Sequence, residues 1–378
     1  MSLGRVRYIL NVMLRLGEVI DSSWEWMITV LFRPFNFKKW LLLGFVALMA
    51  GHLGGSGRGS FSDRQKRAPR QAQAAVVSAS SLFYQTNAQV KTQAPQEIYE
   101  KIRNFFFSLT PRKKFVLFSI SLLVLVVFII LSWLSARFQF VFLEDLVKND
   151  ASIKNPFKSN QPLGRSLFCF NLVFYALSFM LAGLIIFLGI LALTNIGVFD
   201  KTVHLGFKKI FLTGFPYAMF VLLIVFIAAI IYLIVHDFVV AVMWKDKISI
   251  RQAWPKTLSI LGAAKADFIK YLFAKLGLAI CAAIIFGIFH LVITFALLIP
   301  AGIIGAIGYL IYRLIPTGLR WAYWVVLAII GVPTFLFVIY CLICFDLPVG
   351  VFFRTLSLKF FARLEPHYDL FSYVNQEG

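Results

Sequence analysis

Six ionisable side chains lie inside long apolar segments or at the ends of these segments. They are His290, His236, Asp237, Asp346, Glu144 and Asp145. An ionisable group among apolar residues is costly and marks a functional position unless a neighbour pairs with it. Carboxylates beside a histidine can carry a proton or bind a cation. The sequence therefore offers candidate sites for proton transfer or cation binding.

A structural role competes with each of these functional roles. His290 is either a proton relay or ligand contact, or a side chain that hydrogen-bonds a neighbouring helix. The carboxylates either gather into one cluster or pair separately with Arg137, Lys245, Arg354 or neighbouring residues where spans meet elbows. The structural role is favoured for His290 and for the carboxylates. A buried charge is stable mainly when an opposite charge lies beside it.

Motifs for catalysis, cofactors or metals are missing from the sequence. It contains no HExxH, DxD, Walker A or GxSxG pattern, and no dinucleotide-binding glycine motif after a strand. Cys341 and Cys344 form a CxxC, but their neighbours are apolar and no second Cys or His pair is near in sequence. Packing is the favoured role for both cysteines. We expect no catalytic residues, no cofactor and no bound metal.

Long apolar segments must position the six candidates. Residues 115–136 contain no charged side chain, and the whole chain is 60% hydrophobic and 14% charged, against about 25% charged in soluble domains. About 20 apolar residues in a helix cross the ~30 Å hydrocarbon core. The sequence predicts an all-α, polytopic helical membrane protein with about six transmembrane helices and interfacial amphipathic elbow helices. The predicted spans are residues 40–53, 115–136, 167–193, 216–237, 277–299 and 322–345.

Two segments leave the number of spans between five and seven. Residues 40–53 are short for a span, although Lys38 and Lys39 can snorkel toward the headgroups. Pro300 is expected to end the fifth span. The glycine-rich residues 302–312 then form a re-entrant or interfacial hairpin, or a tilted extension of the span.

The rest of the chain divides by composition into five parts. Residues 1–39 are an amphipathic cytoplasmic or interfacial segment, and residues 40–53 are the short first span. Residues 54–114 are a long, flexible, basic outer loop, because they hold few large apolar groups. Residues 115–346 are the helical membrane core, and residues 347–378 are an interfacial or cytoplasmic C-terminal segment.

Basic residues predict the orientation. With the N-terminus inside, the inner segments are residues 1–39, 137–165, 245–275 and 346–378, and they hold 21 of the 37 Lys and Arg residues. Eleven of the remaining 16 lie in the long 54–114 loop, and loops of that length follow the positive-inside rule poorly. The short loops therefore favour both termini on the cytoplasmic side.

Three span ends share a pattern of apolar residues, a charged residue and then Ser with Ile or Leu. They are residues 137–153, 236–250 and 345–358. Ser152, Ser249 and Ser357 are expected to be N-caps or turn residues. Each end would lead into an interfacial elbow, with Trp254, Phe353 and Arg354 as anchors at the membrane surface. Chance similarity among membrane-exit sequences is the alternative.

Three stretches also carry a family resemblance: residues 26–45, the AlaArgPheGlnPhe of residues 136–140, and residues 237–244. They resemble a group of uncharacterised bacterial integral membrane proteins. That group is related to the membrane domain of some glycerophosphodiester phosphodiesterases. The resemblance implies a bacterial cytoplasmic (inner) membrane and a helical fold of about six spans. It implies no activity and no catalytic residues, and nothing here resembles the phosphodiesterase domain.

Three functional classes remain. A non-catalytic membrane scaffold or accessory protein is favoured by the elbow pattern. A transporter or channel for a small solute or lipid is the alternative, since Pro300 and the glycines that follow it suggest a broken helix. A lipid-modifying membrane enzyme is third. The expected partners are anionic lipid headgroups and other proteins or a second copy of the chain. Nucleic acid is not expected, because the net charge of +20 suits cytoplasmic loops facing anionic lipid.

Overall fold

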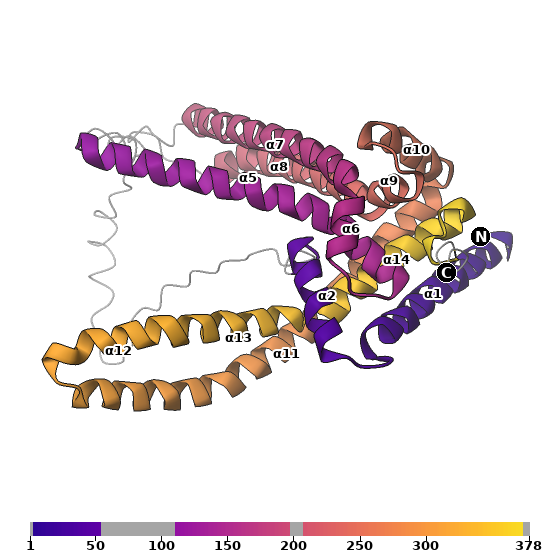
Figure 1. Cartoon of the computed structure of the whole chain (residues 1–378). Coiled ribbons are helices and arrows are strands. Elements are labelled where there is room, and N and C mark those ends of the chain that lie inside the picture. The colour runs from indigo at the N-terminus through magenta and orange to yellow at the C-terminus, as the bar shows by residue number, and fades with distance from the viewer. Residues whose placement is uncertain (1–2, 54–109, 197–206, 373–378) are drawn as a thin grey trace, which may run out of the picture. The chain divides into compact units, whose positions relative to one another are not determined.

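The computed structural model describes residues 3–53, 110–196 and 207–372, and the regular elements in these ranges are all helices (Figure 1). The α-helices are α1 (Leu3–Phe32), α2 (Phe37–Met49), α5 (Pro111–Lys148), α6 (Lys154–Ser159), α7 (Gln161–Ile196), α8 (Phe207–Ile234), α9 (Val240–Asp246), α10 (Ile250–Ala263), α11 (Lys265–Leu314), α12 (Arg320–Val326), α13 (Val332–Cys344) and α14 (Leu347–Leu364). The described π-helices are η1 (Val235–Val239) and η3 (Leu327–Gly331), and the 3-10 helices are η2 (Thr317–Leu319) and η4 (Pro366–Tyr368). The predicted all-α fold is confirmed. Of the predicted outer loop, residues 54–109 lie outside the described residues.

Within the described residues, five helical segments are long and apolar enough to cross a membrane, as expected of a multi-pass membrane protein. They are Pro111–Lys148, Gln161–Leu191, Gly214–Asp246, Lys265–Leu314 and Thr317–Leu364. Helix α2 is not among them, because its 13 residues cover only about 20 Å at helical rise. The count of five lies at the lower end of the predicted range.

The described residues divide into two compact units. Unit 2 contains the outer parts of α5, α7 and α8, within Ser60–Ile130 and Tyr175–Ala229. In this unit Phe128 packs edge-on against Tyr175 at 5.7 Å, and the Tyr217 hydroxyl donates a hydrogen bond to the Ile185 carbonyl at 2.6 Å. Most other large side chains of these stretches are exposed and apolar, which is the pattern of helices that face lipid.

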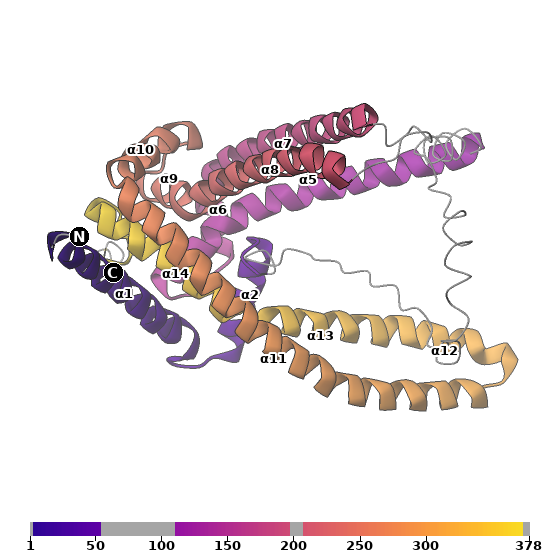
Figure 2. The same cartoon turned by 180° about the vertical axis from the view of Figure 1, so that it is seen from behind.

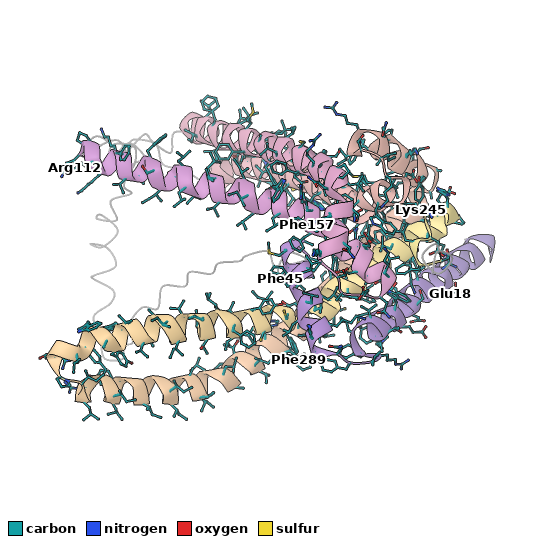
Figure 3. All side chains as sticks on the ribbon, viewed as in Figure 1. Glu18, Phe45, Arg112, Phe157, Lys245 and Phe289 are labelled. Carbon is teal, nitrogen blue, oxygen red and sulfur yellow. The ribbon has the colours of Figure 1, made fainter. Side chains whose placement is uncertain are left out.

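Unit 1 contains the remaining helices, including a long antiparallel pair formed by α11 and the run from α12 to α13 (Figures 1 and 2). Contacts hold the pair together at both ends. At one end Phe286 lies 5.8 Å from Phe345, and at the other Tyr312 lies 5.4 Å from Tyr323. Between these contacts α11 extends about 40 Å, enough to cross a bilayer. Exposed apolar side chains such as Phe289 project from the pair (Figure 3).

Helix α11 does not end at Pro300, contrary to the expected helix end. It continues from Lys265 to Leu314 with the proline inside it. A proline removes one backbone hydrogen bond and bends a helix, but a membrane helix tolerates it when neighbouring groups satisfy the freed carbonyl. Residues 302–312 are therefore an extension of α11, which was one of the predicted alternatives, and not a hairpin.

The buried core of unit 1 lies where the ends of several helices meet, and we call it the helix-end core. It comprises residues 136–147, 234–244 and 347–361 with the faces of α1 and α2 that cover them. All four segments predicted to share one membrane face, residues 1–39, 137–165, 245–275 and 346–378, belong to unit 1.

One face of helix α1 is buried by protein. Val19, Ser23, Met27 and Val30 recur at helical spacing and are all buried. Helix α1 packs on α14, and Lys359 Nζ donates a hydrogen bond to the Ser22 carbonyl at 2.6 Å. Most of the segment predicted over residues 1–39 is therefore this one helix, Leu3–Phe32. Its predicted position on the membrane remains a prediction.

The three predicted elbows have different structures. Helix α10 begins after Ser249, which occupies the predicted N-cap position, and α6 begins one residue later than Ser152 predicts. Ser357 is neither a cap nor a turn residue. It lies inside α14, buried, with its hydroxyl donating to the Phe353 carbonyl at 2.8 Å. The chain turns earlier, at Phe345 and Asp346, because α14 must re-enter the helix-end core.

The two cysteines of the CxxC are free thiols, and Cys344 packs where α2 meets α13. A Cβ atom at Gly44 would lie 2.6 Å from the Cys344 Sγ. Beside it, the Tyr340 hydroxyl donates a hydrogen bond to the Leu41 carbonyl at 2.5 Å. The glycine therefore permits a close approach of the two helices, as the packing role predicts.

Gly44→Ala is expected to destabilise the protein by about 1–3 kcal/mol, because the added methyl group overpacks this contact. Thermal unfolding in detergent measures the effect. Gly277→Ala is the matched control, since a Cβ there meets nothing within 4 Å and only the gain in helix propensity remains. Adding Cys344→Ala to Gly44→Ala should recover part of the loss. Equal stability of the two alanine variants would contradict the close contact.

Candidate functional site

The predicted site residues lie at three places in unit 1, and the most polar of these is around Asp237. His236 and Asp237 lie on the π-helix η1, and both are buried. A π-helix shifts backbone hydrogen bonds from i→i+4 to i→i+5 and often occurs at functional sites. Here it turns two consecutive polar side chains into the helix-end core.

The Asp237 carboxylate is bound by two groups from α11. Lys275 Nζ forms an ion pair with Asp237 Oδ2, and the Tyr271 hydroxyl donates to the same oxygen at 3.2 Å. Tyr271 and Lys275 are four residues apart, so they lie on one face of α11. The Tyr271 hydroxyl also lies 2.8 Å from the Ser357 hydroxyl. The Asp237 carboxylate thus connects η1 to α11 directly and to α14 through the Tyr271 hydroxyl.

Arg354 of α14 contacts the backbone of η1 and not its carboxylate. Its Nη1 donates hydrogen bonds to the carbonyl of His236 and, at 3.3 Å, to that of Asp237. Arg354 is 1% exposed, and the ion pairs found among the described residues do not include it. The buried Arg354 guanidinium therefore binds backbone carbonyl groups. Among the described residues, no carboxylate lies within ion-pair distance of it.

His52 approaches the same place from the end of α2. Gly350, one turn before Arg354 on α14, would meet the His52 carbonyl at 3.2 Å if it carried a Cβ. Gln139 of α5 donates a hydrogen bond to the Ala50 carbonyl at 2.7 Å and holds this stretch of chain in place. Burial lowers the pKa of His52 well below its usual 6.5, and the positive charges of Arg354 and Lys275 contribute. His52 is therefore neutral at physiological pH.

Glu144 and Asp145 form a second place, at the end of α5. Glu144 accepts hydrogen bonds from Lys148 and Asn160, each at 2.7 Å, and from the Trp244 indole at 3.3 Å. Asp145 Oδ1 accepts the Ser152 amide at 3.2 Å. These bonds connect α5, the turn after it, α6 and α9. The arrangement suits a structural role for both carboxylates.

His290 and Asp346 form the third place, where α11 meets the turn before α14. His290 Nε2 lies 3.6 Å from Asp346 Oδ1, and its Nδ1 lies 2.9 Å from the Phe286 carbonyl. Both side chains are about one-fifth exposed. This pair joins two candidates that are 56 residues apart in sequence.

One predicted alternative was that the carboxylates gather into one cluster. They lie instead at three separate places. Among the described residues, no group of three or more His, Cys, Asp and Glu side chains could hold a metal ion. None of the three basic residues named in the prediction pairs with these carboxylates among the ion pairs of the described residues, but Glu144 pairs with its neighbour Lys148, as the prediction allowed. Lys148 and Lys275 bind the carboxylates, whereas Arg354 binds carbonyl groups.

Comparison with known proteins gives a family for most of the chain. Residues 17–371 match the model of a family of unknown function, DUF7544. The chain belongs to this family. None of the curated proteins and none of the solved structures matches it. This match does not link the chain to the membrane domain of glycerophosphodiester phosphodiesterases.

The family match covers every site residue described above, but the family has no function to transfer to them. The roles predicted for His290, His236, Asp237, Asp346, Glu144 and Asp145 therefore remain predictions. What the structure adds to them is their partners.

Two of the three predicted membrane-surface anchors are buried in protein. Phe353 is 6% exposed and packs on Phe352 at 5.3 Å, and Arg354 is buried more completely. Both belong to the helix-end core because α14 folds back into it, so neither is an exposed anchor. Trp254 is half-buried on α10, with its ring 6.2 Å from that of Phe170.

Three partners in the Asp237 region were missed from the sequence. Lys275 and Tyr271 precede an apolar run and look like ordinary loop and interface residues. Their spacing of four residues was the available signal. His52 follows a glycine within a short apolar segment, and nothing local indicates that it is buried.

Proposed function

We propose that the protein is a non-catalytic scaffold or accessory protein of the bacterial cytoplasmic membrane, with both termini inside. The observation that carries the proposal is the helix-end core. Residues 136–147, 234–244 and 347–361 meet there with the buried faces of α1 and α2 in one tightly packed body. The apolar pair of α11 and the run from α12 to α13 extends from this body within unit 1. A rigid body at one membrane face suits a protein that positions lipids or other proteins. The resemblance to bacterial membrane proteins supports the choice of membrane.

The aromatic residues at the other end of the α11–α12 pair support this placement. Tyr312, Tyr323 and Trp324 pack together with ring centroids 5.4–6.0 Å apart. The Arg320 guanidinium lies 5.1 Å from the centre of the Tyr312 ring. Aromatic and basic residues gather at membrane–water interfaces. This cluster then marks the outer interface, and the helix-end core lies at the inner one.

Exposed aromatic side chains on unit 1 give the scaffold a surface for contacts. Trp24 on α1 is 56% exposed and Phe35, in the link to α2, is 58% exposed. Trp24 also packs edge-on against Phe352 of α14 at 6.1 Å, so the helix-end core supports it. A photo-crosslinking residue at position 24 should give a discrete protein or lipid adduct in native membranes. The same residue at the wholly buried Phe140 is the control and should give only internal crosslinks.

A carrier is the second candidate, and the His290–Asp346 pair favours it. The pair lies partly exposed between α11 and the turn before α14, where proton transfer could accompany a movement of the helix pair. Vesicles containing only the purified protein test this. Solute flux that disappears in His290→Ala and persists in Thr334→Ala, a change elsewhere on the helix pair, would replace the scaffold proposal with the carrier.

A further inference from the structure

We propose that the helix-end core contains a binding site for a phosphate-type oxyanion, formed by Arg354, His236 and His52. The proposal goes beyond a scaffold function, because it assigns a specific ligand to the protein. The ligand is either the phosphate of a phospholipid headgroup or free phosphate. The proposal rests on the charge of the buried groups, on hydrogen-bond donors without a partner among the described residues, and on the three separate chain segments that carry these donors.

The charges around Arg354 do not balance. Two buried or nearly buried cations, Arg354 and Lys275, share one carboxylate, that of Asp237. Lys275 is paired with this carboxylate directly and Tyr271 donates to it. Among the described residues, the acidic groups that act electrostatically on Arg354 are Asp237 and the Tyr271 hydroxyl. A buried charge left without a counter-ion is strongly destabilising, so an anion beside Arg354 would stabilise this core.

The structural role of Arg354 uses only part of its guanidinium. Nη1 binds the carbonyls of η1, and this contact alone would explain a buried arginine. The Nε and Nη2 donors, however, are buried without a hydrogen-bond partner. These two form the edge of the fork that binds two oxygens of a phosphate or carboxylate together. The unused edge is therefore the one suited to an oxyanion.

Two histidines bring further polar atoms to this place. Both ring nitrogens of His236 and Nε2 of His52 are buried without a hydrogen-bond partner. Arg354 is within electrostatic range of both histidines. His236 packs against Tyr232 at 4.0 Å and His52 against Phe142 at 4.8 Å, so aromatic rings hold both imidazoles. Three separate segments, α14, η1 and the end of α2, therefore each contribute buried polar atoms without a partner among the described residues, and a phosphate-type ion has enough oxygens to accept from several of them.

Ligand binding to the delipidated full-length protein tests the proposal. Thermal unfolding is followed in detergent while inorganic phosphate or dihexanoyl phosphatidic acid is added, with chloride and dihexanoyl phosphatidylcholine at equal ionic strength as references. A saturable rise in Tm is expected with phosphate, with phosphatidic acid or with both. Stronger binding of phosphatidic acid identifies a lipid headgroup, and binding of inorganic phosphate alone identifies the free ion.

His52→Leu is the informative variant, because leucine has no hydrogen-bond donor, whereas Arg354 also holds η1 in place and its replacement disturbs the fold. Loss of one hydrogen bond to a charged ligand should weaken binding about tenfold. Lys256→Gln is the control, since Lys256 is exposed and pairs with Asp246 at 2.9 Å. That variant should bind like the original protein.

Lipid that remains bound through purification would mask the titration, so native mass spectrometry of the purified protein is part of the test. A retained phospholipid that is lost in His52→Leu supports the site. The proposal is overturned if no phospholipid is retained and neither probe raises Tm. It is also overturned if chloride raises Tm equally, or if His52→Leu retains and binds these ligands as tightly as Lys256→Gln does.

Discussion

Asp237→Asn is expected to lower the free energy of unfolding by about 3–5 kcal/mol, because it removes one partner of a buried ion pair. Asparagine has nearly the same shape and can still accept the Tyr271 hydroxyl. The decrease in the free energy of unfolding therefore measures the effect of removing the Asp237 charge. Lys275, whose side chain is 18% exposed, would be left beside the buried Arg354 without a carboxylate between them. Unfolding in mixed micelles, followed by tryptophan fluorescence, measures the change.

A matched control for this substitution lies on the same helix as Lys275. Asp267→Asn breaks the Asp267–Lys270 pair, which has a 3.4 Å contact and side chains 34–40% exposed. An exposed pair contributes only about 0–1 kcal/mol. Adding Lys275→Met to Asp237→Asn should restore part of the stability, since it removes the orphaned charge. If Asp237→Asn costs no more than Asp267→Asn, the buried pair does not hold η1 to α11.

The helices could be predicted because their cause is local. A continuous apolar run such as residues 115–136 must be helical in a membrane, since every backbone group needs an internal partner there. The same pattern underestimates how far helices extend. Helix α5 continues to Lys148 because its last turns are buried in the helix-end core. Pro300 likewise marks a weak point in α11 and not its end.

The candidate site could be predicted only in part, because its pairing is not local. Charged residues in apolar surroundings identified His236 and Asp237. Their partners lie 38 residues away at Lys275 and 118 residues away at Arg354, and no pattern within one helix indicates such contacts. Arg354 was assigned to the membrane surface because a basic residue after a span usually faces headgroups. The return of α14 into the core reverses that assignment.

Phe238→Ala is expected to cost about 3–5 kcal/mol, because it opens a cavity in the helix-end core. Phe238 is fully buried on η1. Four rings surround it with centroids 5.3–6.2 Å away, those of Phe268, Tyr271, Phe360 and Phe361. These rings come from α11 and α14, so one side chain joins the same helices as the Asp237 ion pair does.

Phe335→Ala makes the same chemical change at an exposed position, on α13, where the side chain is 64% exposed. It should change the stability in detergent by no more than about 0.5 kcal/mol. Comparing the two variants separates the loss of core packing at Phe238 from the general effect of removing an apolar side chain. Phe238 neighbours Asp237, so its loss should also loosen the Lys275 ion pair, and the two substitutions should be less than additive when combined. Strict additivity would mean that aromatic packing and the ion pair hold η1 independently.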